Sequence, residues 1–542
     1  CNALWINPCF DSPFQDAGYD VRDYKKAAPR YGTNEDLFSL FRQAHKKGIH
    51  VLLGLVPGHT SQEHEWFRKS CELERNEYSD RYIWTDFCFR GTGNYGYPYI
   101  GGETSRPGTY LLNFFKCQPA LNYGWLHADE AWKFSCDSEE AAATREAMKD
   151  VMRFWMDHGC DGFRVDMAAS LVKGDDEKKT GTSRIWKNIR QMLDKEYPSC
   201  ALVAEWSNPD LSLKAGFHMD FLLNEFGSLQ STLIRDYQFH GGRICLSDPW
   251  FTGKDKDTLG KSVTLDKIRE AISGGRNAEG VPYFVCGQEE GAEQGTKAAA
   301  NCEKVSDYYD HSFFRKDSGG DITRFMKAYI DLIQRTGDLG YVSMLSCNHD
   351  TVRPAFSLDE REMKLYYSFL FTMPGVPFLY YGDEIGLRYL NLKTKEGGYF
   401  RTGSRTSMQW DSSKNLGFSD AAPEDLYLPV DPSEDAPTVE NQERDSNSLL
   451  NTVRSLLTLR HTDPDLQSSQ NLEILYMKKG KLPFVCRRGH RILAVNPSSQ
   501  TASADIKASS SPLGALAPIW SIGGGSLNNG TITLEPQSFV VF

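Results

Sequence analysis

Seven short apolar runs rich in β-branched residues recur along this chain, and helical patterns separate several of them. They lie at residues 3–7, 50–56, 162–167, 200–205, 220–224, 341–346 and 376–381. Strands that alternate with helices form parallel sheets, because each helix returns the chain to the start of the next strand. The pattern therefore predicts an α/β protein whose runs are neighbouring strands of one parallel sheet.

Polar, chemically active residues come directly after several of these runs, which favours a (β/α)8 TIM barrel, since such a barrel carries its active site at the strand ends. Seven runs are one short of a closed barrel, so the first strand is expected upstream of Cys1. A barrel without one strand exposes two unpaired edges. Residues 1–542 alone are therefore expected to be poorly stable.

The clearest helix is predicted at 139–158. Asp137 is its expected N-cap, and Gly159 is expected to end it. One apolar face of this helix carries Met148, Val151, Met152 and Trp155. Three polar stretches interrupt the strand–helix alternation, at 59–137, 239–321 and 388–447. After a helix at 449–460, short β-like runs with Gly and Ser turns begin near residue 472 and indicate a small β domain.

Composition excludes several classes of function. The net charge is −11, which argues against nucleic acid as a partner because phosphate binding needs clustered Lys and Arg. No uninterrupted apolar run reaches roughly 18 residues, so no membrane span is predicted. The thirteen cysteines are scattered and form no C-x-x-C pair, which predicts neither a zinc site nor a disulfide framework. Buried, reduced thiols in a cytoplasmic enzyme are expected.

Two carboxyl groups end neighbouring strands of the predicted barrel, Asp166 and Glu205. Adjacent strands lie about 4.8 Å apart, and retaining cleavage of a glycosidic bond needs two carboxyl groups about 5–5.5 Å apart. Arg164 shares a strand face with Asp166 and is expected to hold it ionised as a nucleophile. Glu205 lies between Ala204 and Trp206, an apolar setting that favours the protonated form of an acid.

A third carboxylate, Asp350, follows a later strand, and His349 and His59 also lie at strand ends. A further negative charge would stabilise a cation-like transition state, and the imidazoles can donate hydrogen bonds to a sugar. Each residue alone is more often a cap or a satisfied polar group. The joint pattern is what points to catalysis.

The segments GFRVD at 162–166, AEW at 204–206 and NHD at 348–350 strongly resemble the signatures of the alpha-amylase superfamily of glycoside hydrolases. The resemblance implies that Asp166 is the nucleophile, Glu205 the acid/base and Asp350 the transition-state stabiliser. It further implies that the subsite for the reacting sugar is lined by Arg164, His59 and His349.

Other segments resemble the oligosaccharide-acting branch of this superfamily, which includes oligo-1,6-glucosidases, α-glucosidases and transglycosylases. They are DAGYD at 16–20, QPALN at 118–122 and RTSMQWD at 405–411. The resemblance implies that Asp16, Tyr19 and Arg405 bind the terminal sugar. It also implies a catalytic barrel at 1–58 and 138–470, an inserted domain after strand 3 at 59–137, and a C-terminal β-sandwich at 471–542.

The chain departs from the family pattern at several positions. Gly54 stands where the family commonly has an Asp that orients the arginine, which predicts that Arg164 is less firmly held. Gly58 replaces an Asn that is a potential metal ligand, and Ala120 replaces an acidic residue. We therefore expect no bound metal, calcium included, and no cofactor. Met167 matches neither residue type that the branch associates with α-1,6 or α-1,4 preference, so the linkage stays open.

The sequence thus predicts a retaining hydrolase that cleaves α-glucosidic bonds of oligosaccharides by double displacement. One alternative is a transglycosylase or glucoside isomerase, which shares the covalent intermediate and differs in water access. A second is a non-catalytic relative that serves as a binding or partner subunit.

Overall fold

The computed structural model describes residues 1–90, 96–223, 229–234, 256–267, 312–317, 321–393, 395, 399–506 and 515–542. Within these residues the chain forms two compact units. Unit 1 comprises Cys1–Phe221 and Asp338–Tyr341, and unit 2 comprises Leu222–Gly337 and Val342–Phe542. Most of the predicted polar stretch 239–321 lies outside the described residues.

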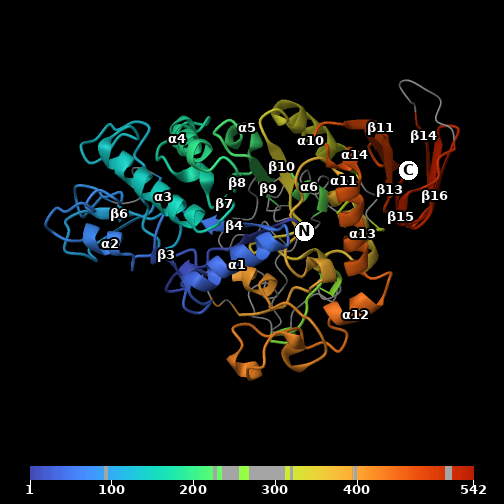
Figure 1. Cartoon of the computed structure of the whole chain (residues 1–542), viewed down its shortest axis with the longest axis horizontal. Helices are drawn as coiled ribbons and strands as arrows, with labels where there is room; N and C mark the ends of the chain where they lie inside the picture. Colours follow the sequence, from blue (N-terminus) through green and yellow to red (C-terminus); the bar gives the residue numbers. More distant parts are fainter. Residues whose placement is uncertain are drawn as a thin grey trace, which may run out of the picture. The chain divides into compact units, whose positions relative to one another are not determined.

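A parallel sheet forms the centre of unit 1 (Figure 1). Its strands follow the order β1 (Ala3–Ile6), β4 (His50–Leu55), β7 (Gly162–Val165), β8 (Ala201–Ala204) and β9 (Met219–Leu222). The register pairs Gly54 with Arg164 and Val165 with Ala204. Each strand was predicted within a few residues, and the sheet places the residues after β7 and β8 side by side.

Helices connect these strands, as the alternation predicted. They are α1 (Asn34–Lys46), α3 (Glu139–Asp157), α4 (Thr180–Glu196) and α5 (Pro209–Ser212). The predicted apolar face of α3 is buried in the core of the unit. The predicted N-cap was wrong by one residue. The side chain of Ser138, not Asp137, accepts the hydrogen bond from the Ala141 N–H. Gly159 follows the helix with φ +103°, as expected for a left-handed terminator.

The segment between β4 and α3 contains little regular structure, apart from α2 (Glu65–Ser70) and a small hairpin of β5 (Tyr99–Gly101) and β6 (Thr109–Leu111). Another small antiparallel pair, β2 (Phe10–Asp11) and β3 (Asp23–Ala27), frames the loop at 12–22. Bridges join His59 to Ala120 and Tyr82 to Leu121. The insertion is thereby tied to the residues that follow β4.

Unit 2 contains the second half of the predicted barrel strands and helices. Its elements before the C-terminal sheets are α6 (Ser231–Ile234), α10 (Thr323–Thr336), β10 (Tyr341–Met344, of which Tyr341 belongs to unit 1), α11 (Glu360–Thr372), α12 (Val439–Arg444), α13 (Leu449–Thr462) and α14 (Pro464–Gln467). The predicted strand at 376–381 is reduced to a parallel bridge between Phe378 and Leu345. The N–H groups of Val376 and Phe378 donate to the Val342 and Met344 carbonyls, and Pro377 between them has no N–H for a ladder on the opposite side.

Two antiparallel sheets end the chain, in the order β11-β12-β13-β18-β15 and β14-β17-β16. Their strands are β11 (Leu472–Lys478), β12 (Lys481–Arg488), β13 (Arg491–Asn496), β14 (Ala502–Asp505), β15 (Trp520–Ile522), β16 (Gly525–Asn528), β17 (Thr531–Leu534) and β18 (Ser538–Val541). One hydrophobic core of unit 2 joins residues of these sheets, such as Phe484 and Val541, to Tyr329 and Leu370 of the helices. The exact domain boundaries stay a prediction.

Candidate active site

The pair of carboxylates at the ends of β7 and β8 is bridged by one guanidinium. Nη1 of Arg164 donates to Oδ1 of Asp166 over 2.9 Å, and its Nη2 donates to Oε1 of Glu205. Glu205 also accepts the N–H of Met167 at 2.9 Å. The Arg164 side chain is 1% exposed, and those of Asp166 and Glu205 are 10% and 12% exposed. The structure therefore brings these three predicted residues together in a nearly buried cluster.

The electrostatics of this cluster differ from the prediction. Burial, followed by the charge of Glu205, raises the pKa of Asp166 well above its usual 3.8, whereas Arg164 lowers it. The predicted apolar setting of Glu205 is wrong, because its carboxylate accepts hydrogen bonds from a guanidinium and a backbone N–H. Arg164 contacts both carboxylates and therefore does not distinguish them.

Arg164 is not loosely held, although Gly54 replaces the expected Asp. Its guanidinium lies 4.7 Å from the ring centroid of Trp5, in addition to its two carboxylate contacts. A Cβ at residue 54 would lie 2.7 Å from Cδ and 2.9 Å from N of Pro8. Glycine is thus required by the close passage of the Pro8 backbone, and Trp5 supplies a further contact to the arginine.

The predicted sugar-binding residues Asp16, Tyr19 and His59 are all buried in unit 1. The amide of Gln118, from the insertion, donates to Asp16 at 2.8 Å. Nε2 of His59 lies 3.1 Å from the Tyr19 carbonyl oxygen, and its Nδ1 lies 3.0 Å from Nδ2 of Asn113. Both ring nitrogens of His59 therefore have protein partners.

Three residues beside the predicted site adopt the left-handed backbone conformation that non-glycine residues rarely take. Ala17, Met167 and Ser207 have φ values of +51°, +43° and +57°. Each lies one or two residues after a predicted site residue. Such backbone conformations cluster at functional sites, where the surrounding structure enforces them.

Asp220 on β9 is a buried residue that sequence reasoning missed. Its carboxylate accepts the backbone N–H groups of Trp206, Ser207 and Asn208 at 2.9–3.2 Å and the Ser212 hydroxyl at 2.8 Å. Burial raises the pKa of Asp220 to about 7 against these hydrogen bonds, which lower it. Asp220 therefore holds the turn that follows Glu205.

Unit 2 contains the other predicted site residues, His349, Asp350 and Arg405. Nε2 of His349 lies 3.0 Å from Oδ2 of Asp350, and Nη2 of Arg405 lies 3.1 Å from Oδ1. Arg401, which no motif signalled, donates to Oδ1 at 2.8 Å. Burial raises the pKa of Asp350, but His349, Arg405 and Arg401 outweigh burial and hold the pKa well below its usual value. Asp350 is therefore an ionised carboxylate.

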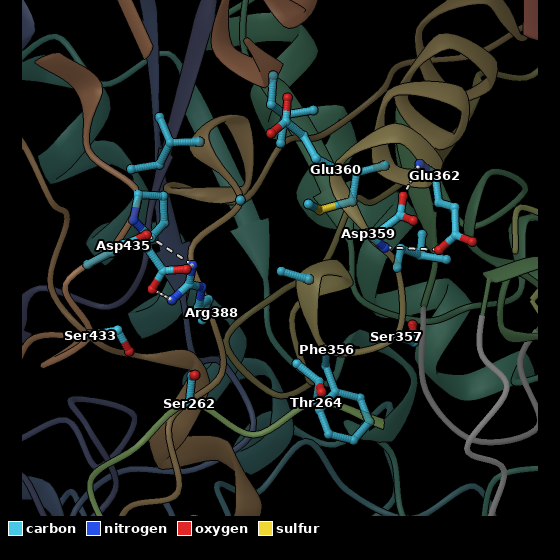
Figure 2. A pocket seen from close by; sticks show the side chains of 18 of the residues that line it. Ser262, Thr264, Phe356, Ser357, Asp359, Glu360, Glu362, Arg388, Ser433 and Asp435 are labelled. Carbon is cyan, nitrogen blue, oxygen red and sulfur yellow. Dashed lines mark hydrogen bonds and ion pairs between the residues drawn. The ribbon is translucent and has the colours of Figure 1, made fainter. Parts of the chain in front are cut away.

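A cavity of about 640 Å³ lies elsewhere in unit 2. Figure 2 shows Arg388 paired with Asp435 and Glu362 bonded to Asp359 in its wall. Of the predicted site residues, none belongs to the described lining of this cavity. Its charged groups largely neutralise one another, as in the pair of Lys316 with Asp359 at 3.0 Å.

The model of the alpha-amylase catalytic domain matches residues 1–219 and 303–469, which is more than half of the chain. The protein belongs to the alpha-amylase family. Among similar members is the trehalose synthase/amylase TreS of Mycolicibacterium smegmatis, which is 30% identical over 490 residues, 85% of this chain and 69% of that protein. The oligo-1,6-glucosidase of Heyndrickxia coagulans is 26% identical over 563 residues, 93% of this chain and 86% of that protein.

The fold of this alpha-amylase family member resembles that of isomaltulose synthase from Erwinia rhapontici NX5. The TM-score is 0.69 at 21% identity, with 100% of this chain and 91% of that chain covered. Within the described residues, no helix is both long and apolar enough to span a membrane. No group of three or more His, Cys, Asp or Glu side chains there is arranged to hold a metal ion.

Proposed function

We propose that this protein is a retaining α-glucosidase that acts on α-linked oligosaccharides by double displacement. The main observation that supports this proposal is the buried triad in which Arg164 bridges Asp166 and Glu205. Membership of the alpha-amylase family and similarity to an oligo-1,6-glucosidase support the substrate class. The buried free thiols among the described cysteines support a cytoplasmic location.

In the proposed mechanism, Asp166 attacks the anomeric carbon while Glu205 protonates the leaving oxygen. Glu205 then removes a proton from the water that hydrolyses the glycosyl-enzyme. The first step needs one ionised and one protonated carboxyl group. The pKa of Asp166, raised by burial and by the charge of Glu205, sets the pH above which this residue is ionised for the attack. Asp350, ionised beside Arg401 and Arg405, is proposed to stabilise the transition state.

We test the nucleophile by replacing Asp166 with Asn, which keeps the shape and removes the charge. Turnover of an aryl α-glucoside should fall by more than about a thousandfold, with an unchanged thermal unfolding midpoint. The matched control is Asp137→Asn, because Asp137 is an exposed partner of Arg184. Activity of Asp166→Asn within about tenfold of wild type would disprove the assignment.

A second candidate function is glucoside isomerisation or transglycosylation, because TreS of M. smegmatis is among the similar proteins. Incubation with maltose, isomaltose, sucrose and trehalose separates the two. Hydrolysis releases glucose in proportion to substrate consumed, whereas isomerisation converts one disaccharide into another. A non-catalytic role is disfavoured because Asp166, Glu205 and Asp350 are all present. An inactive wild-type protein would support it.

A further inference from the structure

Gly58, the second departure from the family pattern, leaves a space that a side chain of the insertion occupies. A Cβ at residue 58 would lie 2.8 Å from Nδ2 of Asn113. Asn113 follows β6, and its backbone N–H donates to the Gln118 carbonyl at 3.0 Å. The insertion therefore delivers a carboxamide to the position directly before His59.

The orientation of this carboxamide is fixed by a buried lysine. Nζ of Lys173 donates to Oδ1 of Asn113 at 3.0 Å and to the Ser170 carbonyl at 2.7 Å. An ammonium or amine nitrogen on lysine donates here, so the oxygen end of Asn113 must face Lys173. The nitrogen end then faces His59 and donates to Nδ1 over 3.0 Å.

The protonation of the His59 ring follows from these contacts. Nδ1 accepts a hydrogen bond, so the proton of a neutral ring sits on Nε2, which donates to the Tyr19 carbonyl at 3.1 Å. A protonated Nδ1 would point a hydrogen at the Asn113 amide hydrogens. His59 is 1% exposed. Burial lowers the pKa of His59 to about 3, and the nearby Lys173 also lowers it.

We propose that Asn113 is a positioning residue that fixes His59 as the neutral Nε2–H tautomer and thereby holds the loop of Asp16 and Tyr19. Gly58 makes room for Asn113, and Lys173 anchors it. The sugar-binding role of that loop rests on the proposed function, whereas the tautomer of His59 does not. An experiment can therefore disprove the proposed function without disproving the tautomer of His59, and the reverse.

The tautomer is measured without any sugar, by NMR of protein labelled with ¹⁵N-histidine. The His59 signal is assigned with His59→Gln. Wild type is expected to show a neutral ring protonated on Nε2 at pH 7. In Asn113→Asp, one carboxylate oxygen still accepts from Lys173, but the other cannot donate to Nδ1. The ring should then carry a proton on Nδ1 in addition to the one on Nε2, which still faces the Tyr19 carbonyl.

Asn447→Asp is the matched control, because Asn447 is exposed and lies in unit 2. It should leave the His59 signal unchanged. A wild-type ring protonated on Nδ1 would overturn the proposal even if no variant folded. So would an Asn113→Asp ring that keeps the wild-type tautomer.

A double-mutant cycle of Gly58 and Asn113 tests the steric role of Gly58. Gly58→Ala should displace the Asn113 amide, and kcat/KM should fall by about tenfold, mainly through a higher KM, as expected for one lost hydrogen bond. In the Asn113→Ala variant there is no amide for the new Cβ of Gly58→Ala to displace. Adding Gly58→Ala to that variant should therefore lower kcat/KM by less than about twofold. Fully additive effects would contradict the proposal. If no glucoside is turned over but Asn113→Asp adds the proton on Nδ1, the proposed function fails and this inference stands.

Discussion

At the scale of single residues, both glycine departures from the family pattern are matched by a neighbouring group. The Pro8 backbone passes where a side chain at residue 54 would lie, and the Asn113 amide lies where one at residue 58 would lie. Arg164 nevertheless contacts two carboxylates, and both ring nitrogens of His59 have protein partners. A missing motif residue is therefore weak evidence for a decayed site when another part of the chain fills its space.

The raised pKa of Asp166 predicts the acid side of the pH–rate profile. In the proposed mechanism Asp166 must be ionised to attack, and its raised pKa keeps it protonated to a higher pH than an ordinary aspartic acid. kcat/KM for an aryl α-glucoside should therefore fall, as pH decreases, through an apparent pKa above the usual 3.8. The profile is measured in buffers of constant ionic strength between pH 3 and 9.

The control for this profile is the unfolding midpoint at each pH, which separates titration from acid denaturation. An acid limb at or below pH 3.8, with the fold intact, would contradict the raised pKa of Asp166.

Sequence reasoning found Asp166, Glu205 and Arg164 because their contacts follow from strand adjacency and from the two-residue repeat of a strand. It missed Asp220, Asn113 and Arg401 because most of their side-chain partners lie 12 or more residues away and no motif marks them. It also misjudged the surroundings of Glu205. One of the two donors to the Glu205 carboxylate is the Met167 N–H, and only the folded backbone brings this N–H close to it.

At the scale of elements, most strands were predicted because they are short apolar runs with polar residues directly after them. Of the strand predicted at 376–381, the structure retains the bridge of Phe378 to Leu345 and the hydrogen bond from the Val376 N–H to the Val342 carbonyl. The helix α3 was predicted from the spacing of its apolar residues, and this spacing identifies a helix without specifying its first residue. Its N-cap was assigned to Asp137 instead of Ser138 because both residue types suit that position.

This difference at the N-cap is testable. Ser138→Ala removes the acceptor of the Ala141 N–H and should lower the free energy of unfolding by about 1 kcal/mol. Asp137→Ala is the matched control. It removes only an exposed ion pair with Arg184 and should cost less than about 0.5 kcal/mol. Urea titrations of both variants check this, and a larger loss for Asp137→Ala would return the cap to that residue.

At the scale of the whole molecule, the C-terminal sheets share a core with helices of unit 2. Arg488 on β12 adds polar contacts there and is fully buried. It donates to the Thr372, Asp465, Leu466 and Ser468 carbonyls and to Oδ1 of Asn471. These contacts of Arg488 could not be predicted from the sequence, because most of its partners are backbone carbonyls.

Arg488→Met should lower the free energy of unfolding by about 3 kcal/mol or more, since it leaves several buried carbonyls without donors. Arg487→Met, one residue earlier, breaks only a contact with the Glu473 carboxylate at 3.1 Å and should cost under about 1 kcal/mol. Chemical denaturation followed by tryptophan fluorescence measures both. Equal losses would show that Arg488 does not hold the sheet to the helices.

The turn after Glu205 has a consequence for altering this protein by directed evolution. Asp220 grips Trp206, Ser207 and Asn208 through their main-chain amides, not their side chains. The side chains of Trp206 and Asn208 can thus be exchanged, short of proline, without removing these hydrogen bonds, whereas the left-handed backbone of Ser207 (φ +57°) restricts the exchanges at that position. An apolar residue in place of Asp220 would remove all three acceptor contacts at once. Side chains next to Glu205 can therefore be varied while the turn that follows it keeps its hydrogen bonds.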